Sequence, residues 1–231
     1  MLSFTFLPQN LEELLNLSRY SHIPICNLSG DKLNLVNDVF FQRMVKSANM
    51  ISWYSNSLNC DLGGAEEDDF RDLIQRESLS SDISNPNFYD TYTVEIEISM
   101  FAINSICSLD ELRNIDKEAS KLDTRSITTD GFENLDDFYK SRDVFKLLKV
   151  MANGWIEDVL KDQNRYADLL IQNLHRWICQ ENCKMYDKVV ARVLRRLMQK
   201  FLIHLVKKLK ALRATIVYAS TSKLLICTHK R

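Results

Sequence analysis

The sequence predicts a mixed α/β fold, and three patterns support that prediction. Apolar residues recur every three or four positions along several stretches, which is the period of helices with one buried face. Between Thr91 and Ile98, apolar and polar residues alternate instead, which is the period of a β-strand. Near the C-terminus two β-rich runs, 215–218 and 224–227, flank a small polar turn, as in a hairpin.

Size and composition indicate a globular, soluble intracellular protein. A chain of 231 residues that is 45% hydrophobic can bury the core of one large domain or of two small ones. The N-terminus lacks the features of a secretory signal, and no apolar run approaches the roughly 18 residues of a membrane span. The six cysteines are scattered, so we expect reduced thiols rather than a disulfide framework.

Helices are expected in two regions. Residues 11–58 contain two apolar stripes, which Pro24 interrupts because proline disfavours helix in the residue before it. The first stripe contains Leu11, Leu14, Leu15 and Leu17, and the second contains Val39, Phe40, Met44, Val45 and Ala48. Three more helical stretches cover 144–160, 169–177 and 188–212. The longest should bury Val190, Leu194, Leu197, Phe201, Leu205 and Leu209.

The alternating stretch predicts a half-buried strand, with its apolar side toward the core. The apolar residues are Tyr92, Val94, Ile96 and Ile98, and the polar ones are Thr93, Glu95 and Glu97. Residues 65–86 and 112–138 are acidic and without period, so we expect mobile surface loops there. Six aromatic residues are expected in the core: Phe40, Phe41, Trp53, Tyr54, Trp155 and Trp177.

One set of metal-ligating side chains occurs at helical spacing. His175, Cys179 and Cys183 would lie on one face of a helix and present three ligands. A structural zinc ion usually takes four ligands, so ordinary helix residues are the favoured interpretation of this set. We therefore predict no metal site.

Charge is unevenly distributed although the net charge is only −1. Acidic residues collect at 66–69 and between 110 and 137, and basic residues collect from 184 to 213. The outward face of the long helix would present Arg192, Arg195, Arg196, Lys200, Lys207 and Lys208. Such a stripe can contact a phosphate backbone, or it can be a solvated face or pair with the acidic loops. No aromatic residue is interleaved for base stacking, so any DNA binding should be weak.

A strand that ends in an acidic residue is followed by a helical block, a long helix and a terminal hairpin. This order of elements resembles the palm and fingers of family B DNA polymerases. The resemblance is most specific at Asp61-Leu-Gly-Gly64, Gly154-Trp155, Tyr166-Ala-Asp168, Arg176-Trp177 and 216–231. These segments are similar to the C-terminal, non-catalytic half of DNA polymerase epsilon catalytic subunits, where a degenerate second polymerase module follows the active one. The resemblance runs from about Leu11 to Arg231, and Ser18-Arg-Tyr20 and Ile23-Pro-Ile25 match the junction before the palm.

This resemblance implies a domain organisation. Residues 1–60 would be the end of an inactive exonuclease-like region with junction helices. Residues 61–231 would be a degenerate palm and fingers module, truncated before the thumb. The fold would then be a palm-like sheet backed by helices, with a helical remnant of the fingers. Because the parts that should cover the sheet are missing, we expect the isolated chain to associate.

The resemblance also implies that catalysis has been lost. Active family B enzymes hold two Mg²⁺ ions between an aspartate that ends the first palm strand and another in a Tyr-Gly-Asp-Thr-Asp-Ser hairpin. Glu97 ends the strand here, and Ser220 and Ser222 occupy the hairpin positions. Ala102 aligns with the tyrosine that lies under the incoming sugar, and the fingers signature that grips the triphosphate is missing. We therefore predict no catalytic residue, no metal and no phosphoryl transfer.

The function implied is structural: a scaffold segment of a replicative polymerase in the nucleus. The parent would be a Mg²⁺-dependent, DNA-directed DNA polymerase, with zinc and 4Fe–4S cysteine motifs outside this chain. Its partners would be the accessory subunits of the polymerase and the replicative helicase machinery. Two alternatives stay open, an active nucleotidyltransferase and a DNA-binding module built on the basic helix.

Overall fold

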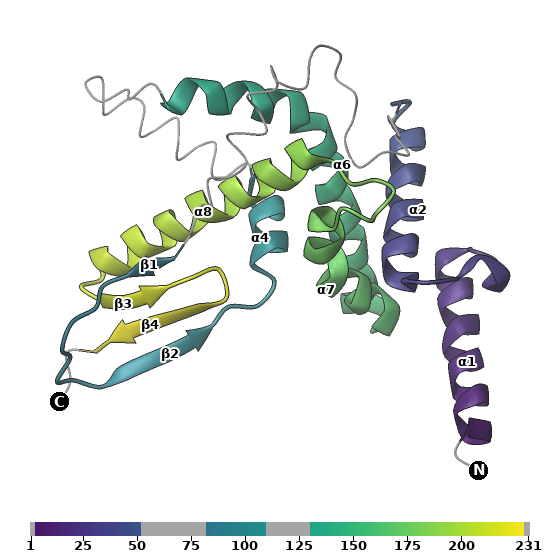
Figure 1. Cartoon of the computed structure of the whole chain (residues 1–231), viewed down its shortest axis with the longest axis horizontal. Helices are drawn as coiled ribbons and strands as arrows, with labels where there is room; N and C mark the ends of the chain where they lie inside the picture. The colour runs from purple at the N-terminus through teal and green to yellow at the C-terminus, as the bar shows by residue number, and fades with distance from the viewer. Residues whose placement is uncertain (1–2, 52–81, 110–129, 229–231) are drawn as a thin grey trace. The chain divides into compact units, whose positions relative to one another are not determined.

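The computed structural model describes the backbone of residues 3–51, 82–109 and 130–228, and their side chains except at 3–10 and 130–141 (Figure 1). The chain divides into two compact units. The helical unit consists of Met1–Tyr54 and Ile106–Val193, and the sheet unit consists of Ser55–Ser105 and Leu194–Arg231. The predicted mixed α/β class is confirmed. The two units interleave along the sequence.

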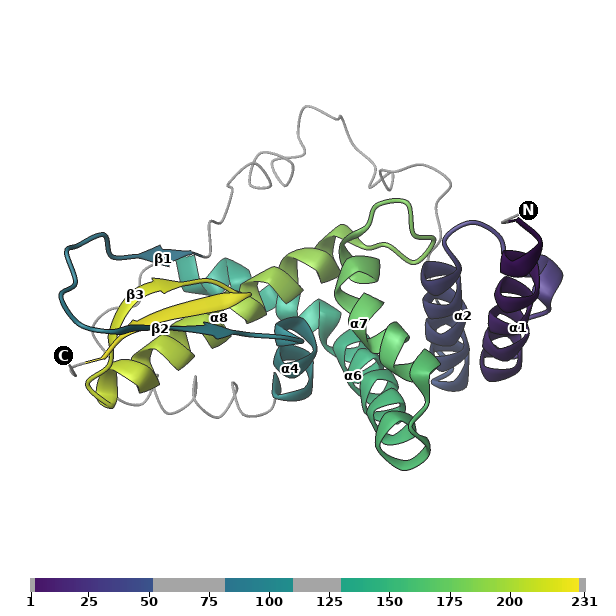
Figure 2. The same cartoon turned by 90° about the horizontal axis from the view of Figure 1, so that it is seen from below.

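Four helices build most of the helical unit. They are α1 (Ser3–Ser21), α2 (Lys32–Ser47), α6 (Asp130–Asp162) and α7 (Arg165–Cys179), with a short 3₁₀ turn, η1 (Ile25–Asn27), after α1. α2 packs against both α6 and α7 (Figure 2). Asp31 caps the start of α2 by accepting the backbone N–H of Asn34, and Asn164 caps α7 by accepting two backbone N–H groups of its first turn. Apolar side chains that are almost completely buried form the core: Val36, Phe145, Leu148, Leu170 and Leu174.

Polar side chains on α2 are buried against α7. Asn34 donates a hydrogen bond to Gln180 Oε1 at 2.8 Å and accepts one from Asn173 Nδ2 at 2.7 Å. One turn further along, Asn37 is completely buried, and its amide group has no hydrogen-bond partner among the described residues. The interface between α2 and α7 is therefore polar where the sequence predicted an apolar stripe.

Asp38 organises the turn that follows α7. Its carboxylate accepts hydrogen bonds from Trp177 Nε1 at 2.8 Å and from the backbone N–H groups of Lys184 and Met185 at 3.3 and 3.2 Å. Because these donors satisfy it, the carboxylate tolerates burial to 8% exposure. Of the stripe predicted on α2, only Val45 is buried, and the prediction of that inward face was wrong.

The predicted aromatic core lies mainly around α6 and α7. Phe41, Trp155 and Trp177 are buried, while Phe40 is half-buried and packs edge-on against Trp155. Trp53 and Tyr54 lie outside the described residues. Aromatic contacts thus connect α2 to both neighbouring helices.

α1 is held to the rest of the helical unit near its C-terminus. Tyr20 packs against Phe40, and its hydroxyl donates a hydrogen bond to Asp158 Oδ2 at 2.8 Å. Burial and this bond raise the pKa of Tyr20 above its ordinary range. Arg43 adds bonds to the backbone carbonyls of Ser21 and His22 at 2.6 and 3.1 Å. Together these contacts fix the end of α1.

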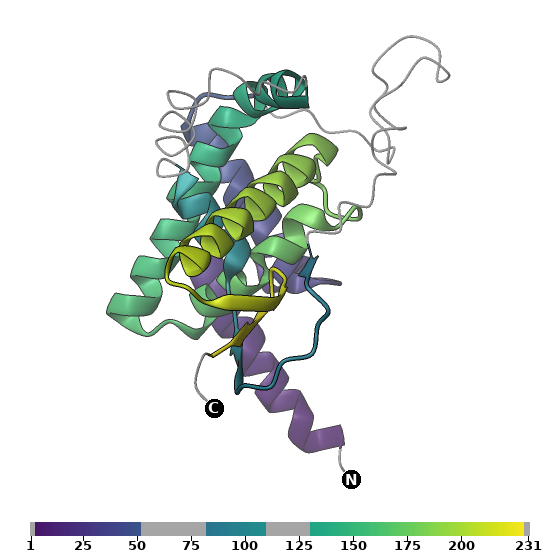
Figure 3. The same cartoon turned by 90° about the vertical axis from the view of Figure 1, so that its left-hand side faces the viewer.

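The sheet unit contains a four-stranded antiparallel sheet in the order β1-β3-β4-β2. The strands are β1 (Ile83–Ser84), β2 (Thr93–Glu97), β3 (Thr215–Ala219) and β4 (Lys223–Cys227). α4 (Phe101–Cys107) follows β2, and α8 (Lys188–Ala211) lies along one face of the sheet (Figures 1 and 3). The strand residues Ile216, Ala219 and Leu224 are buried. On α8, Leu202 and Val206 are also buried.

Several expectations change in detail. All five residues of β2 are exposed, so its apolar side is not buried. Residues 130–138, expected in a loop, begin α6, and Ile83–Ser84 form a short strand. α8 buries Met198, Leu202 and Val206, whereas Phe201, Leu205 and Leu209, predicted inward, are half-buried. Gly63-Gly64 and most of the predicted loops fall outside the described residues. In the described part of the chain, no helix is long and apolar enough to cross a membrane.

Two asparagines on α2 give a matched stability test. We expect Asn37→Leu to raise the free energy of unfolding by about 1 kcal/mol, because the replaced amide is buried without a protein partner. Asn34→Leu should lower it by about 2 kcal/mol, because the amides of Asn173 and Gln180 lose their partner. Urea denaturation of both variants measures the difference. Equal losses of stability would contradict this account of the interface.

Alkaline pH should destabilise the helical unit. Burial raises the pKa of the Cys183 thiol from 9.0 to about 11, and Asp38 and Asp31 act in the same direction. Because the folded state holds this proton more tightly, its stabilising contribution is complete below pH 9 and is lost as the pH rises toward 11. We expect Cys183→Ala to flatten the fall in unfolding free energy over this window. Part of the fall should remain because the pKa of Tyr20 is also raised.

Urea denaturation at a series of pH values checks this expectation. Replacing the exposed Cys26 with alanine serves as the control and should leave the slope unchanged. An identical slope in Cys183→Ala and in the unaltered chain would show that the thiol does not contribute.

Candidate functional site

The end of β2 and the tip of the β3–β4 hairpin meet at the candidate site. Glu97 is paired in register with Lys223, and the next residue, Ile98, donates its backbone N–H to Ser222 O at 2.7 Å. The strand end and the hairpin tip lie at the same end of the sheet (Figure 1). Three predicted positions, Glu97, Ser220 and Ser222, are thereby brought to one place.

Ser220 holds the tip of the hairpin in shape. Its side chain is 5% exposed, and its Oγ accepts hydrogen bonds from the backbone N–H of Ser222 at 3.3 Å and of Lys223 at 3.1 Å. The same hydroxyl contacts the carbonyl of Lys223 at 3.2 Å and the Ser222 hydroxyl at 3.1 Å. The backbone N–H of Ser220 closes the turn on Lys223 O at 2.8 Å. All the bonds of this hydroxyl therefore serve the turn itself.

Lys223 sets the electrostatics of the tip. Its ammonium group lies 3.3 Å from Glu95 Oε1 and 6.0 Å from the centre of the Tyr218 ring. The Tyr218 hydroxyl in turn donates to Asp82 Oδ2 at 2.8 Å. The tip therefore combines neutral hydroxyls, one lysine and the two glutamates of β2. An ammonium group at this place competes with any cation for the same carboxylates.

These residues do not fit a magnesium centre. Mg²⁺ requires several hard oxygen ligands in octahedral geometry, and catalytic pairs of ions are held by converging carboxylates. Throughout the described ranges, no three His, Cys, Asp or Glu side chains are grouped so that they could hold a metal ion. Glu97 is exposed on the strand, and the hairpin supplies hydroxyls rather than negative charges.

Ala102 is buried in a helix rather than exposed on the surface. It is 5% exposed in α4, which begins directly after β2 and is preceded by Met100 in a left-handed conformation with φ of 57°. A buried methyl group cannot form a platform for a bound sugar. The structure therefore places the fourth predicted position in the packing of the sheet unit.

The second predicted surface is the basic face of α8. Arg192, Arg196, Lys200 and Lys207 recur along one side of the helix, while Arg195 and Lys208 flank it. Of the six predicted basic residues, Arg195, Lys200, Lys207 and Lys208 are exposed and the others are half-buried. Arg192, Arg196 and Lys200 already have interaction partners within the chain. The exposed Ile203 interrupts the stripe.

The His and Cys residues considered for a metal do not share one helix. His175 and Cys179 belong to α7, which ends at Cys179, and Cys183 lies in the turn beyond it. Cys183 is buried, and its raised pKa keeps it a thiol at neutral pH. The helix ends before Cys183, so the three side chains do not lie on one helix face as their spacing suggested.

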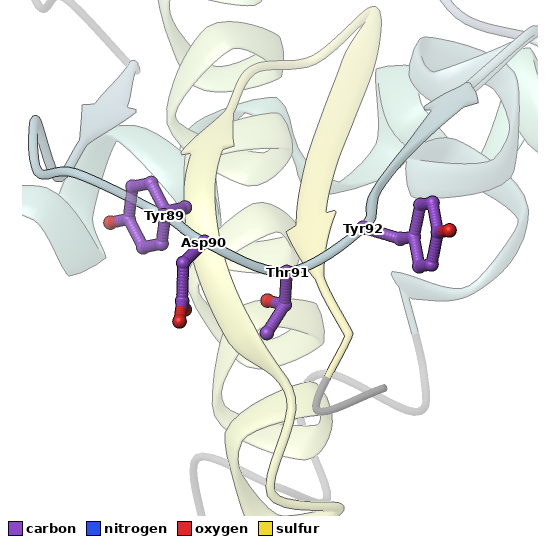
Figure 4. A pocket seen from close by; sticks show the side chains of 4 residues that line it. All are labelled: Tyr89, Asp90, Thr91 and Tyr92. Carbon is purple, nitrogen blue, oxygen red and sulfur yellow. The ribbon is translucent and has the colours of Figure 1, made fainter. Parts of the chain in front are cut away.

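A shallow surface hollow lies at the opposite end of β2. Tyr89, Asp90, Thr91 and Tyr92 line it, and Figure 4 shows the two tyrosine side chains pointing in opposite directions. Thr91 Oγ1 contacts Cys227 Sγ at 2.7 Å, so this residue attaches the lead-in of β2 to β4. The polar groups do not converge on a common point, and the hollow therefore has the character of a strand entry rather than of a binding site.

Sequence reasoning assigned no role to Glu95 or Lys223. The alternation along β2 does place Glu95 on the same side as Glu97, and the lysine directly follows the hairpin turn. Only the register, in which Lys223 is opposite Glu97, shows that the lysine shares a face with both glutamates; its ammonium group contacts Glu95. Register depends on long-range pairing, which the local sequence pattern does not specify.

Comparison with known proteins gives a consistent set of relatives. The DNA polymerase epsilon catalytic subunit of Saccharomyces cerevisiae is 32% identical over 232 residues, covering 95% of this chain and 10% of the relative. The Arabidopsis thaliana protein of the same name is 30% identical over 229 residues, covering 96% and 10%. In Dictyostelium discoideum the identity is 28% over 262 residues, covering 93% and 11%. The chain thus spans about a tenth of the length of these relatives.

A family model described as "Domain of unknown function (DUF1744)" matches residues 1–231, the whole chain. Both the match and the similarity to the polymerase subunits extend over the helical unit and the sheet unit. The chain therefore belongs to the DUF1744 family.

Proposed function

We propose that this chain is a non-catalytic structural segment of a DNA polymerase epsilon catalytic subunit, and that it supports chromosomal DNA replication in the nucleus. The observation on which this proposal rests is the hairpin tip. Ser220 is bound into the turn, Ser222 is neutral, and Lys223 stands opposite Glu97. A polymerase centre needs carboxylates there to bind its metal ions.

In this proposal the sheet unit is a degenerate palm, and the helices between its strands are a remnant of the fingers. The antiparallel pairing of β2 with the hairpin and the covering helix α8 support this assignment. Residues 1–60 would be junction helices after an inactive exonuclease-like region. The accessory subunits and the replicative helicase machinery would be the partners, and the Mg²⁺, zinc and 4Fe–4S sites of the parent would lie outside this chain.

Variants of the full-length polymerase polypeptide that contains this segment test the proposal. Ser220→Ala with Ser222→Ala should leave primer extension unchanged, because neither hydroxyl takes part in chemistry. Leu170→Asp with Leu174→Asp, at two fully buried positions, should disrupt the helical unit and reduce recovery of the other subunits while primer extension by the catalytic subunit continues. Loss of extension in the serine variant would refute a non-catalytic role.

Restoring the lost acids should create a weak metal site without catalysis. In Glu97→Asp, Ser220→Asp, Ser222→Asp, three carboxylates would converge and raise one another's pKa values unless a cation neutralises them. We expect Mg²⁺ at about 10 mM to stabilise this variant by about 1.4 kcal/mol, as for a Kd near 1 mM. Asparagine at all three positions is the matched neutral control. Adding Lys223→Ser should enlarge the metal effect, because the competing ammonium group is removed.

No nucleotide incorporation is expected from this triple variant. Orientation of the reacting groups accounts for roughly 7–11 kcal/mol of such a barrier, and the chain lacks the residues that would position a triphosphate. Thermal melts with and without Mg²⁺ and extension of a labelled primer are the measurements. Templated extension above a no-protein control would overturn the inactive assignment.

The alternative function, DNA binding by α8, is favoured by the exposed Arg195, Lys207 and Lys208. Charge reversal separates the two proposals. If the chain is a scaffold, Lys200→Glu, Lys207→Glu, Lys208→Glu should bind duplex DNA as weakly as the control Lys32→Glu, Lys46→Glu, Lys184→Glu, with Kd above about 10⁻⁶ M at physiological salt. A tenfold loss in the α8 variant alone, with a steep salt dependence, would favour the DNA-binding module.

A further inference from the structure

Among the strands that the structure describes, β2 forms one edge of the sheet, and none of them pairs with its outer side. The bonds from Ile98 N to Ser222 O and from Thr228 N to Tyr92 O fix the hydrogen-bonding alternation between β2 and β4. In an antiparallel ladder only every second residue bonds to the neighbouring strand. Val94 and Ile96 therefore bond to β4. It follows that the backbone N–H and C=O groups of Thr93, Glu95 and Glu97 point to the open edge.

The apolar layer of the sheet continues to this edge, where its side chains are exposed among the described residues. Ile96 is opposite Leu224 in register, and Val94 is opposite Ile226, so these side chains share one face. Leu224 is 3% exposed, whereas Val94 and Ile96 are 45% and 42% exposed. Tyr92, two residues before Val94, is 71% exposed. A further strand beside β2 would bury this apolar surface.

The other face of the edge is acidic. Glu95 and Glu97 stand two residues apart on it, and the single Lys223 contacts Glu95. Pairing with the β2 edge of a second copy would set Glu95 against Glu95 or Glu97, and like charges directly opposite each other destabilise a strand pair. A strand that presents basic side chains on this face would instead be attracted.

We propose that the open edge of β2 receives one further strand, supplied by a part of the same polypeptide outside residues 1–231, in which apolar residues alternate with Lys or Arg. The basic side chains would lie beside Glu95 and Glu97, and the apolar ones beside Val94 and Ile96. The inference rests on the proposed function, since the chain spans about a tenth of the polymerase subunits that it resembles.

The probes are overlapping synthetic peptides of about 15 residues. Together they cover the rest of the full-length polypeptide. Fluorescence anisotropy measures their binding to the 231-residue chain, and hydrogen exchange locates it. We expect a peptide with alternating apolar and basic residues to bind and to protect the N–H groups of Thr93, Glu95 and Glu97. Protection confined to other residues would overturn the assignment of the edge.

Two variants of the β2 edge distinguish backbone pairing with the peptide from non-specific association. Glu95→Pro removes an outward N–H but no bond to β4, so it should weaken the peptide at least about tenfold while the melting temperature changes little. Glu95→Lys with Glu97→Lys should also weaken it about tenfold, because both charge pairs become repulsive. Glu181→Lys, at an exposed position in the helical unit, is the control and should bind normally.

Three results would overturn the inference: no peptide binds, both edge variants bind normally, or the chain forms dimers that Glu95→Pro dissociates. Sedimentation measures the last of these. If the edge proposal is wrong, the proposed function still stands, because primer extension by the serine variant tests that function independently. Loss of extension in the serine variant would refute the non-catalytic role even if a peptide binds β2.

Discussion

The register between β2 and β4 determines what stands at the hairpin tip. Because Glu97 pairs with Lys223 and Ile98 bonds to Ser222, the end of one strand is locked to a turn more than a hundred residues later in the sequence. A shift by one residue would turn every side chain of β2 to the opposite face. The same register sends the backbone groups of Glu95 and Glu97 outward, so the site and the open edge have a common cause.

At the tip, the turn of the hairpin is held by neutral hydroxyl groups rather than by carboxylates. The turn needs an oxygen at position 220 that accepts two backbone N–H groups, and a serine hydroxyl supplies this as well as a carboxylate does. Folding therefore places no demand for negative charge on this position. Ser220 is therefore sufficient for the turn, and Lys223 pairs with Glu95 beside it.

Periodicity predicted the elements better than it predicted their buried faces. The hairpin, the long helix and the strand at 93–97 appear where the sequence indicates them. On α2 the rule that buried means apolar fails, because Asn34 and Asp38 find partners at Asn173 and Trp177, far away in sequence. Likewise, the alternating sequence of β2 does not show that the strand lies at a sheet edge beside β4, where its apolar side chains are exposed. The resemblance named Glu97, Ser220 and Ser222, but only the register shows that Lys223 lies on the same face as Glu95 and Glu97.

The two units satisfy their surfaces differently, and this contrast bears on a structural role. In the helical unit, α2 packs against α6 and α7, and its buried polar groups are largely paired within the unit. In the sheet unit, α8 lies on one face, while a five-residue edge with exposed Val94 and Ile96 has no partner strand within the described residues. An uncovered edge of this kind favours association. These properties fit the proposed role, in which a further strand of a larger polypeptide would complete the sheet.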